Sequence, residues 1–337
     1  LLVRDSQDEL QAIAPLMFVR GLDIRRQRRL MLLGTDNSAA DYADFIVAEG
    51  MPAARQAILD WIVGQRRRWT SLELLNLPEA SPTLQLESLP RALRNPLRQF
   101  AAEAPARLLG DIDADRRMLA KKSLRRHVNG FSRDGHLEYR RLSTAEEVDA
   151  HLDRFFDQHR RRWAGTASPS LFDDPAQQAF YRMLATRLDP AQALHFGVVL
   201  FEQRPIAYHF GFEHDGVFTW YKPSFEPELQ RRSPGEVLIR FLLEDAVSRG
   251  LREFDFTVGS EAFKFRFATV ARRVYRLRVY RRAWERLPAH GRELLKRLLA
   301  TLRQRAQLMR SGNAGPAAGW PPARSAWRKF PSAPGGG

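Results

Sequence analysis

The chain has 337 residues, 44% of them hydrophobic, which is enough to bury one large core or two medium ones. It contains no cysteine, and this excludes disulfides, thiolate metal sites and a cysteine nucleophile. Its formal net charge is +15, and only six of its 54 basic residues are lysines. Because arginine binds phosphates and carboxylates in two-point geometry, this favours an anionic ligand, nucleic acid or an acidic surface. A genome rich in G and C would give the same arginine bias without any function.

The first third of the chain alternates segments typical of strands and of helices, which predicts an α/β half. Residues 1–20 hold two apolar runs around turn residues; they predict a hairpin, before which we expect natural N-terminal sequence to be missing. We expect strands at 28–34 and 71–78, with a helix at 52–63 between them. A further helix is expected at 90–102.

The middle of the chain is predicted to be mainly helical. A basic helix is expected at 113–128, with Asp113 capping its start, and we interpret it as a bridge between two halves. A short strand at 136–142 precedes the letters STAEE, a capping-box pattern that starts a helix ending at Trp163. A second helix is expected at 175–188.

Residues 194–222 then change to a period of two, which predicts three successive strands in LHFGVVLF, IAYHFGF and VFTWYKP. The Asp215–Gly216 pair between the last two is a strong hairpin signal. After them come the turn QRRSPG, a helix at 235–248 and a strand at 252–258. This order of three antiparallel strands, a turn, a helix and a strand resembles the core of the GCN5-related N-acetyltransferase (GNAT) fold.

We therefore expect the α/β (α+β) class with a mixed, mostly antiparallel sheet flanked by helices, and the family resemblance described below implies tandem GNAT-like domains that each have such a sheet. Residues 268–286 hold seven arginines against one acid, and the end of the chain is rich in proline, glycine and alanine. The predicted domains are a degenerate GNAT-like domain at 1–112, a GNAT acyltransferase domain at 113–290, a helix at 291–310 and a disordered tail at 311–337.

The turn QRRSPG lies where acyltransferases of this fold place a Q/R-x-x-G-x-G/A turn. In that turn, backbone N–H groups and the positive end of the helix hold the pyrophosphate of coenzyme A. Pro234 removes one N–H donor, which side-chain contacts from the two arginines would offset. The alternative is a plain connector. The candidate cofactor-binding residues are Gln230, Arg231, Arg232, Ser233, Gly235 and Glu236.

Three side chains are candidates for proton transfer. Asp255 lies in an apolar strand, so it is either a buried ion-pair partner of Lys264 or Arg266, or a functional acid or base. His209 shares a strand face with small residues that leave room for an approaching group, and it is a candidate general base; a hydrogen-bonded core histidine is the commoner case. Tyr221 is either a proton donor to a leaving thiolate or a packing residue.

Several features together resemble the CelD/BcsL-like acyltransferase family, a GNAT-type group associated with bacterial cellulose and other exopolysaccharide synthesis. They are the KKSLRR helix, the Arg162–Trp163 pair, IAYH, the SPG turn and the FDF…G…FKFRF string. That family is similar to Fem-type peptidoglycan aminoacyltransferases, which have two GNAT-like domains in tandem. The resemblance implies that Asp255, Gly259 and Lys264 line the acceptor side of the groove. Further candidate substrate-binding residues are Arg162, Trp163, Trp220, Lys222 and Arg266.

The leading hypothesis is direct transfer of an acyl group, in the first place acetyl, from acetyl-CoA or another acyl-CoA to a hydroxyl or amine of a sugar or cell-envelope precursor. One alternative is a Fem-like transferase that uses aminoacyl-tRNA, since a +15 chain suits RNA. Another is a catalytically inactive GNAT-like subunit that binds a membrane surface or biosynthetic complex through the arginine-rich C-terminal segment. The histidines show no HExxH pattern, so we expect no metal. We expect a cytoplasmic protein, with peripheral contact at the inner membrane as an option, because no apolar run approaches about 20 residues.

Overall fold

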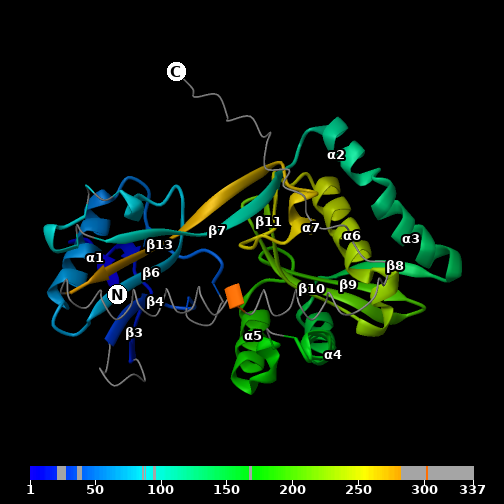
Figure 1. The fold of residues 1–337 in the computed structure, drawn as a ribbon, viewed down its shortest axis with the longest axis horizontal. Helices are drawn as coiled ribbons and strands as arrows, with labels where there is room; N and C mark the ends of the chain where they lie inside the picture. The colour runs from blue at the N-terminus through cyan, green and yellow to red at the C-terminus, as the bar shows by residue number, and fades with distance from the viewer. Residues whose placement is uncertain are drawn as a thin grey trace. The chain divides into compact units, whose positions relative to one another are not determined.

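The computed structural model describes residues 1–20, 28–35, 40–85, 87, 89–93, 96–166, 169–281 and 301–302. Their main feature is a ten-stranded mixed sheet flanked by helices (Figure 1), which confirms the predicted α/β class. In spatial order its strands are β3 (Leu16–Arg20), β4 (Arg28–Leu32), β6 (Ser71–Pro78), β13 (Val270–Tyr280), β7 (Leu97–Leu108), β12 (Glu253–Asp255), β11 (Val217–Phe225), β10 (Arg204–His214), β9 (Leu194–Phe201) and β8 (Leu137–Leu142).

The N-terminal half follows the predicted strand–helix–strand order. The predicted hairpin is present as β1 (Leu2–Arg4) and β2 (Leu10–Ile13), which form a small sheet with β5 (Ile46–Val47). Helix α1 (Pro52–Gly64) connects the parallel strands β4 and β6 and has proline at its start, where the missing N–H does no harm. Its apolar face packs on these strands in one hydrophobic core.

The helix predicted at 90–102 is wrong. In the described part of this stretch, the helical residues are those of the short 3-10 helix η3 (Arg91–Leu93). The 12-residue strand β7 begins at Leu97. The alanines, arginines and glutamine of β7 favour a helix locally, but the strand pairs with β12 on one side and β13 on the other. Pairing with partners about 150 or more residues away therefore overrides local propensity.

The single basic helix predicted at 113–128 is also wrong, because the chain breaks into two helices. They are α2 (Ile112–Leu119) and α3 (Lys122–Asp134). The side chain of Asp111, not Asp113, caps α2 by accepting from the N–H of Ala114 at 3.0 Å. Both helices pack against α6 (Pro234–Ser248), while the long paired strands β7 and β13 connect the two halves (Figure 1).

The C-terminal half confirms most of the predicted elements. Thr144 and Glu147 form the capping box that starts α4 (Ala145–Trp163), and α5 (Pro175–Arg187) follows after the 3-10 helix η4 (Leu171–Asp173). Helices α4 and α5 cover one face of β8 to β11, and α6 covers the other (Figure 1). The remaining elements are the 3-10 helices η1 (Pro82–Leu84) and η5 (Pro227–Arg232), and helix α7 (Ala262–Phe265). Among the described helices, none combines the length and the apolar character that a membrane crossing requires.

The arginine-rich segment that was predicted to contact a membrane or a complex forms, as far as Tyr280, the strand β13. Arg272 forms an ion pair with Glu253, and Arg278 forms one with Glu73 at 3.1 Å. Part of this basic charge is therefore neutralised within the sheet. Most of the predicted C-terminal helix and the whole tail at 311–337 lie outside the described residues, of which 301–302 are helical.

The strand pairing changes abruptly next to the predicted turn. Strands β11 and β12 run parallel and pair only over Val217–Thr219 and Glu253–Asp255, after which β11 continues unpaired on that side to Phe225. In the same place the register of β10 and β11 shifts, so that Trp220 and Tyr221 together face one residue, Gly211, as in a β-bulge. We call residues 220–222 and 255–259 the β11–β12 junction.

Candidate active site at the β11–β12 junction

In the predicted cofactor turn, several backbone N–H groups are hydrogen-bonded to carbonyls of the turn itself. Ser233 has a left-handed conformation (φ 58°), and its N–H donates to the carbonyl of Gln230 at 3.0 Å. The N–H groups of Glu236 and Val237 donate to the carbonyl of Ser233 at 3.0 and 3.3 Å, and Pro234 has no N–H. The backbone therefore offers fewer free donors to a phosphate than the sequence motif suggests.

The side chains of the turn differ in their availability. Arg232 donates to the carboxylate of Asp134 at 2.8 Å, and its guanidinium lies 4.0 Å from the ring centre of Phe131. Arg231 is exposed. Glu236 forms an ion pair with Arg266 at 2.6 Å, which places Arg266 beside the turn. Of the two arginines predicted to bind phosphate, Arg231 is thus the one that is not held by α3.

Asp255 lies at the centre of the junction and is 6% exposed. Its Oδ1 accepts two hydrogen bonds, from the hydroxyl of Tyr42 at 2.9 Å and from the N–H of Thr257 at 2.7 Å. Burial raises the pKa of this carboxyl to about 6, although both hydrogen bonds oppose the shift. Oδ2 has no hydrogen bond to any residue that the structure describes. Asp255 is therefore a buried carboxylate that titrates near neutral pH and keeps one oxygen available.

The ion-pair partners expected for Asp255 bind elsewhere. The ammonium of Lys264, which is 4% exposed, donates to the carbonyl of Val258 at 3.0 Å and pairs with Glu261 at 3.1 Å. Arg266 pairs with Glu236, as described above. Asp255 thus has two hydrogen bonds from uncharged groups in place of the predicted salt bridge, and burial outweighs them and raises its pKa.

His209 is completely buried and supports the bulge. Its Nε2 accepts from the N–H of Tyr221 at 3.2 Å, and its ring stacks on that of Trp220 with 5.2 Å between centroids. Burial lowers its pKa well below the usual value, so the ring is neutral. A Cβ on Gly211 would lie 2.2 Å from the imidazole, so the small residue makes room for His209 itself and not for an incoming group. This geometry suits a positioning residue.

Tyr221 and Lys222 extend the junction. The hydroxyl of Tyr181 donates to that of Tyr221 at 2.9 Å, and burial raises the pKa of Tyr221 to about 12. The ammonium of Lys222 lies 4.2 Å from the ring centre of Tyr221. Burial lowers the pKa of Lys222, and the nearby carboxylate of Asp41 opposes this. Two basic side chains, Lys222 and Lys264, thus share this buried region.

Two residues of the N-terminal half complete the junction, and sequence reasoning missed both. The hydroxyl of Tyr42 donates to Asp255. Burial raises the pKa of Asp41, and the nearby positive charges of Lys222 and Lys264 oppose this. Asn76 fixes their segment, because its side chain donates to the carbonyl of residue 40 at 2.7 Å. These residues lie in a connection without periodicity, so no local pattern distinguishes them from a loop.

The remaining predicted residues lie around this centre. Arg162 donates to the carbonyl of Pro223 at 2.7 Å and covers the ring of Phe225, and burial lowers its pKa to about 10. The indole N–H of Trp163 is buried without a hydrogen bond to the described residues. At Gly259 (φ 143°), a Cβ would lie 2.2 Å from the carboxylate of Glu261, so a side chain there is excluded. Within the described ranges, no group of three His, Asp or Glu residues could hold a metal ion.

Residues 118–265 match the family model of the acetyltransferase (GNAT) domain. The match runs from the end of α2 to the end of α7 and includes both the turn and the junction. This stretch thus matches a GNAT domain, and the chain is an enzyme of the GNAT-type transferase class. No curated protein sequence matches the chain.

Solved structures share the fold over most of the chain. The C-terminal domain of a putative lysylphosphatidylglycerol synthetase from Agrobacterium fabrum superposes with a TM-score of 0.58 at 12% identity, covering 86% of each chain. L-PGS from Bacillus licheniformis gives 0.54 at 13% identity and 84% of each chain. FemX gives 0.54 at 10% identity, with 83% of this chain and 87% of that one. At these identities the likeness establishes the fold alone.

Proposed function

We propose that the chain transfers an acyl group, in the first place acetyl, from an acyl-CoA to a hydroxyl or amine of a polysaccharide or cell-envelope precursor, as the resemblance to CelD/BcsL-like proteins implies. One observation carries this proposal. A buried carboxylate with a pKa of about 6 lies where β11 bulges and leaves β12. A carboxylate of this kind can take a proton at neutral pH.

In the proposed reaction the acceptor attacks the thioester carbonyl directly. Oδ2 of Asp255 takes the proton of the acceptor hydroxyl or amine. The C–S bond then breaks, and Tyr221, whose raised pKa keeps its hydroxyl protonated, gives a proton to the leaving thiolate. The N–H of Tyr221 is bound to His209, so we assign stabilisation of the oxyanion to the positive charge of Lys222 and Lys264.

Calorimetry with acetyl-CoA tests the donor. We expect binding that weakens by about 10- to 150-fold in Arg231→Gln, because one charge-assisted contact to phosphate is worth about 1.5–3 kcal/mol. Arg117→Gln, which removes the same charge from exposed helix α2, is the matched control and should bind normally. If millimolar acetyl-CoA gives no heat and no thiol release, a CoA donor is excluded.

The second candidate donor is an aminoacyl-tRNA, and one observation favours it. The N–H groups of Ser233, Glu236 and Val237 are hydrogen-bonded to carbonyls of the turn itself. This suits an acyl donor whose binding does not require backbone N–H groups around a pyrophosphate. The net charge of +15 is suited to RNA. Binding of aminoacyl-tRNA that falls steeply with salt, together with aminoacyl transfer and no response to acetyl-CoA, would establish this donor.

A further inference from the structure

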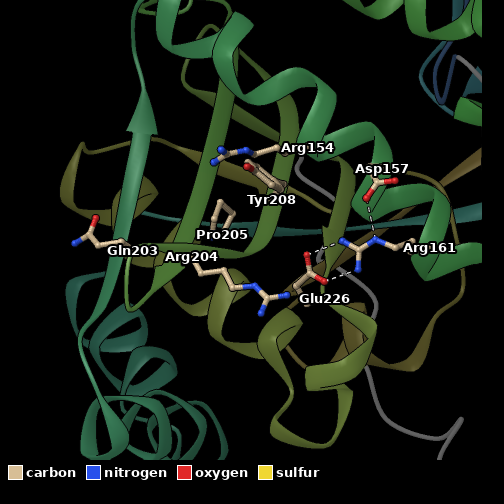
Figure 2. Close-up of a pocket in the computed structure, with 8 residues that line it drawn as sticks. All are labelled: Arg154, Asp157, Arg161, Gln203, Arg204, Pro205, Tyr208 and Glu226. Carbon is tan, nitrogen blue, oxygen red and sulfur yellow. Dashed lines mark hydrogen bonds and ion pairs between the residues drawn. The ribbon is translucent and has the colours of Figure 1, made fainter.

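A polar pocket of about 430 Å³ lies between α4, the turn from β9 to β10, and the end of β11 (Figure 2). None of the residues predicted from the sequence to bind or react lines it. Its walls are formed by Arg154, Asp157, Arg161, Gln203, Arg204, Pro205, Tyr208 and Glu226. The volume is within the range of small-molecule sites.

The acidic groups of the pocket already form ion pairs with arginines of α4. Arg161 binds both oxygens of Glu226, at 2.7 and 2.8 Å, and its Nε binds Asp157 at 2.9 Å (Figure 2). Buried Gln158 donates to Glu226 at 3.0 Å, and Arg160 adds a second positive charge to Asp157 at 3.3 Å. Arg161 is thus shared by Glu226 and Asp157, and it also lies 3.4 Å from Glu228, so each of these carboxylates has an arginine partner within the protein.

Two arginines remain. Arg154, from α4, and Arg204, the first residue of β10, are both exposed and have no hydrogen bond or ion pair to any residue in the part of the chain that the structure describes. Figure 2 shows Arg154 beside Tyr208 and Arg204 extending toward Glu226, whereas Gln203 points away from the others. Two guanidinium groups from separate elements therefore face one concavity, and neither has an ion pair with a described residue.

The positions of these arginines are fixed by the fold. Glu202 and Gln203 both have left-handed backbone (φ 49° and 64°), the geometry of a tight hairpin turn that neither residue favours, and Pro205 favours extended backbone at Arg204, the residue before it. On the other wall, the hydroxyl of Tyr208 is hydrogen-bonded to a ring nitrogen of His151 at 2.8 Å. The fold thus sets the backbone of the pocket, and the two exposed arginine side chains extend from it.

We propose that this pocket binds the phosphate group of a phosphorylated small molecule of about the size of a sugar phosphate. Guanidinium groups bind phosphate oxygens in two-point geometry, and Arg154 and Arg204 would do so from two sides. The half-buried ring of Pro205 offers surface to the rest of the molecule. A concave site of this size suits a small ligand better than an extended polymer. The inference does not depend on the identity of the acyl donor.

The test variant is Arg154→Gln with Arg204→Gln. Arg161 is left intact, because its loss would strand the buried carboxylate of Glu226 and destabilise the protein. The matched control is Arg116→Gln with Arg117→Gln, which removes the same charge from two exposed positions of α2. Equal unfolding midpoints of the two double variants and the parent protein show that folding is unaffected.

Binding is measured by calorimetry on the full chain at low salt, with glucose 1-phosphate, inorganic phosphate and glucose as probes. We expect glucose 1-phosphate to bind more tightly than phosphate, and glucose not to bind. The test variant should lose at least about tenfold in affinity, since two charge-assisted contacts are removed, and the control should lose none. Saturating acetyl-CoA should leave the binding unchanged.

Four results would overturn the proposal. They are no binding of glucose 1-phosphate at about 10 mM, equal binding by the test variant, displacement by acetyl-CoA, and binding of phosphatidylglycerol vesicles that the test variant alone loses while no sugar phosphate binds. The last result would assign the arginines to a lipid phosphate. Because the readout is binding without acyl transfer, the failure of this proposal is distinguishable from failure of the proposed function.

Discussion

The chain contains two parallel strand–helix–strand units that can be compared directly. In the first, α1 connects β4 to β6, and in the second α6 connects β11 to β12. Each parallel pair is matched over three residues, and each helix has proline at its start. The units differ in which strand continues beyond the pairing. In the first unit the second strand, β6, continues beyond the paired residues. In the second unit it is the first strand, β11, that continues, and it contains a bulge.

This difference explains why the junction lies in the second unit. An extended first strand next to the helix start leaves backbone and side chains unpaired in front of the turn, where a donor and an acceptor could meet. The first unit has no such extension, and the segment after β4 instead contributes Asp41 and Tyr42 to the second unit. The N-terminal half is therefore part of the site, and the predictions below test how large its contribution is.

The largest effect is expected for Asp255→Asn. Both hydrogen bonds to Asp255 go to Oδ1, which the amide oxygen of asparagine replaces, so the variant loses ionisation while it keeps its contacts. We expect kcat/KM to fall by about 10²–10⁴, the usual contribution of a general base. In the parent protein kcat/KM should rise with pH up to about 6 and then level off. A variant with parental activity would show that another group takes the proton.

The same variant has an opposite effect on stability. The folded pKa of Asp255 lies above the unfolded value of 3.8, so its contribution to stability is full below pH 3.8 and is lost as the pH rises through about 6. Asparagine does not ionise, so Asp255→Asn does not lose this stability as the pH rises. At pH 8 the variant should be more stable than the parent by about 1–3 kcal/mol, since one unit of pKa shift corresponds to about 1.4 kcal/mol. Urea unfolding at pH 4 and pH 8 measures it, and equal gains at both pH values would contradict the assignment.

Tyr42→Phe tests the contribution of the first unit. The hydroxyl of Tyr42 stabilises the charged form of Asp255, so its removal should raise the pKa of Asp255. We expect the rising limb of the pH profile to move to higher pH by a few tenths of a unit to about one unit, and kcat at pH 6 to fall a few-fold with KM little changed. An unchanged profile would mean that the first unit supports the fold and not the chemistry.

The contrast between these units also shows what sequence patterns can predict. Strands β9, β10 and β11, helix α6 and the capping box of α4 follow from periodicity and turn chemistry that lie within a few residues. The contact between Tyr42 and Asp255 joins residues 213 positions apart, and only the folded sheet specifies it. The same holds for β7, whose residues favour a helix until their partners are known. Asp255 was found because a carboxylate in an apolar strand is conspicuous on its own.

Asn76→Gly should give a smaller effect on the same segment. Glycine keeps the left-handed backbone of Asn76 (φ 58°) and the carbonyl that accepts from the N–H of Ala43, and it removes only the side-chain bond to residue 40. One hydrogen bond is worth about 1 kcal/mol, so kcat/KM should fall by about threefold to fivefold if the segment loses its position. Asn129→Gly, in α3, is the control for a general loss of stability. Equal effects on kcat/KM would rule out a specific role.

The smallest effect is expected at the start of α6, where the two units also differ. Ser233 has φ 58°, while its counterpart before α1, Met51, has φ −109°. Left-handed backbone costs a residue with a side chain about 1 kcal/mol, so Ser233→Gly should stabilise the protein by about 0.5–1 kcal/mol without weakening acetyl-CoA binding. Ser132→Gly, at an exposed position inside α3, should destabilise it by a similar amount. The free energies of unfolding of both variants in urea distinguish relief of backbone strain at Ser233 from a general effect of glycine on stability. A loss of stability in Ser233→Gly would mean that the serine side chain stabilises the turn. The turn would then be a structural connector at the start of α6 and not a phosphate site.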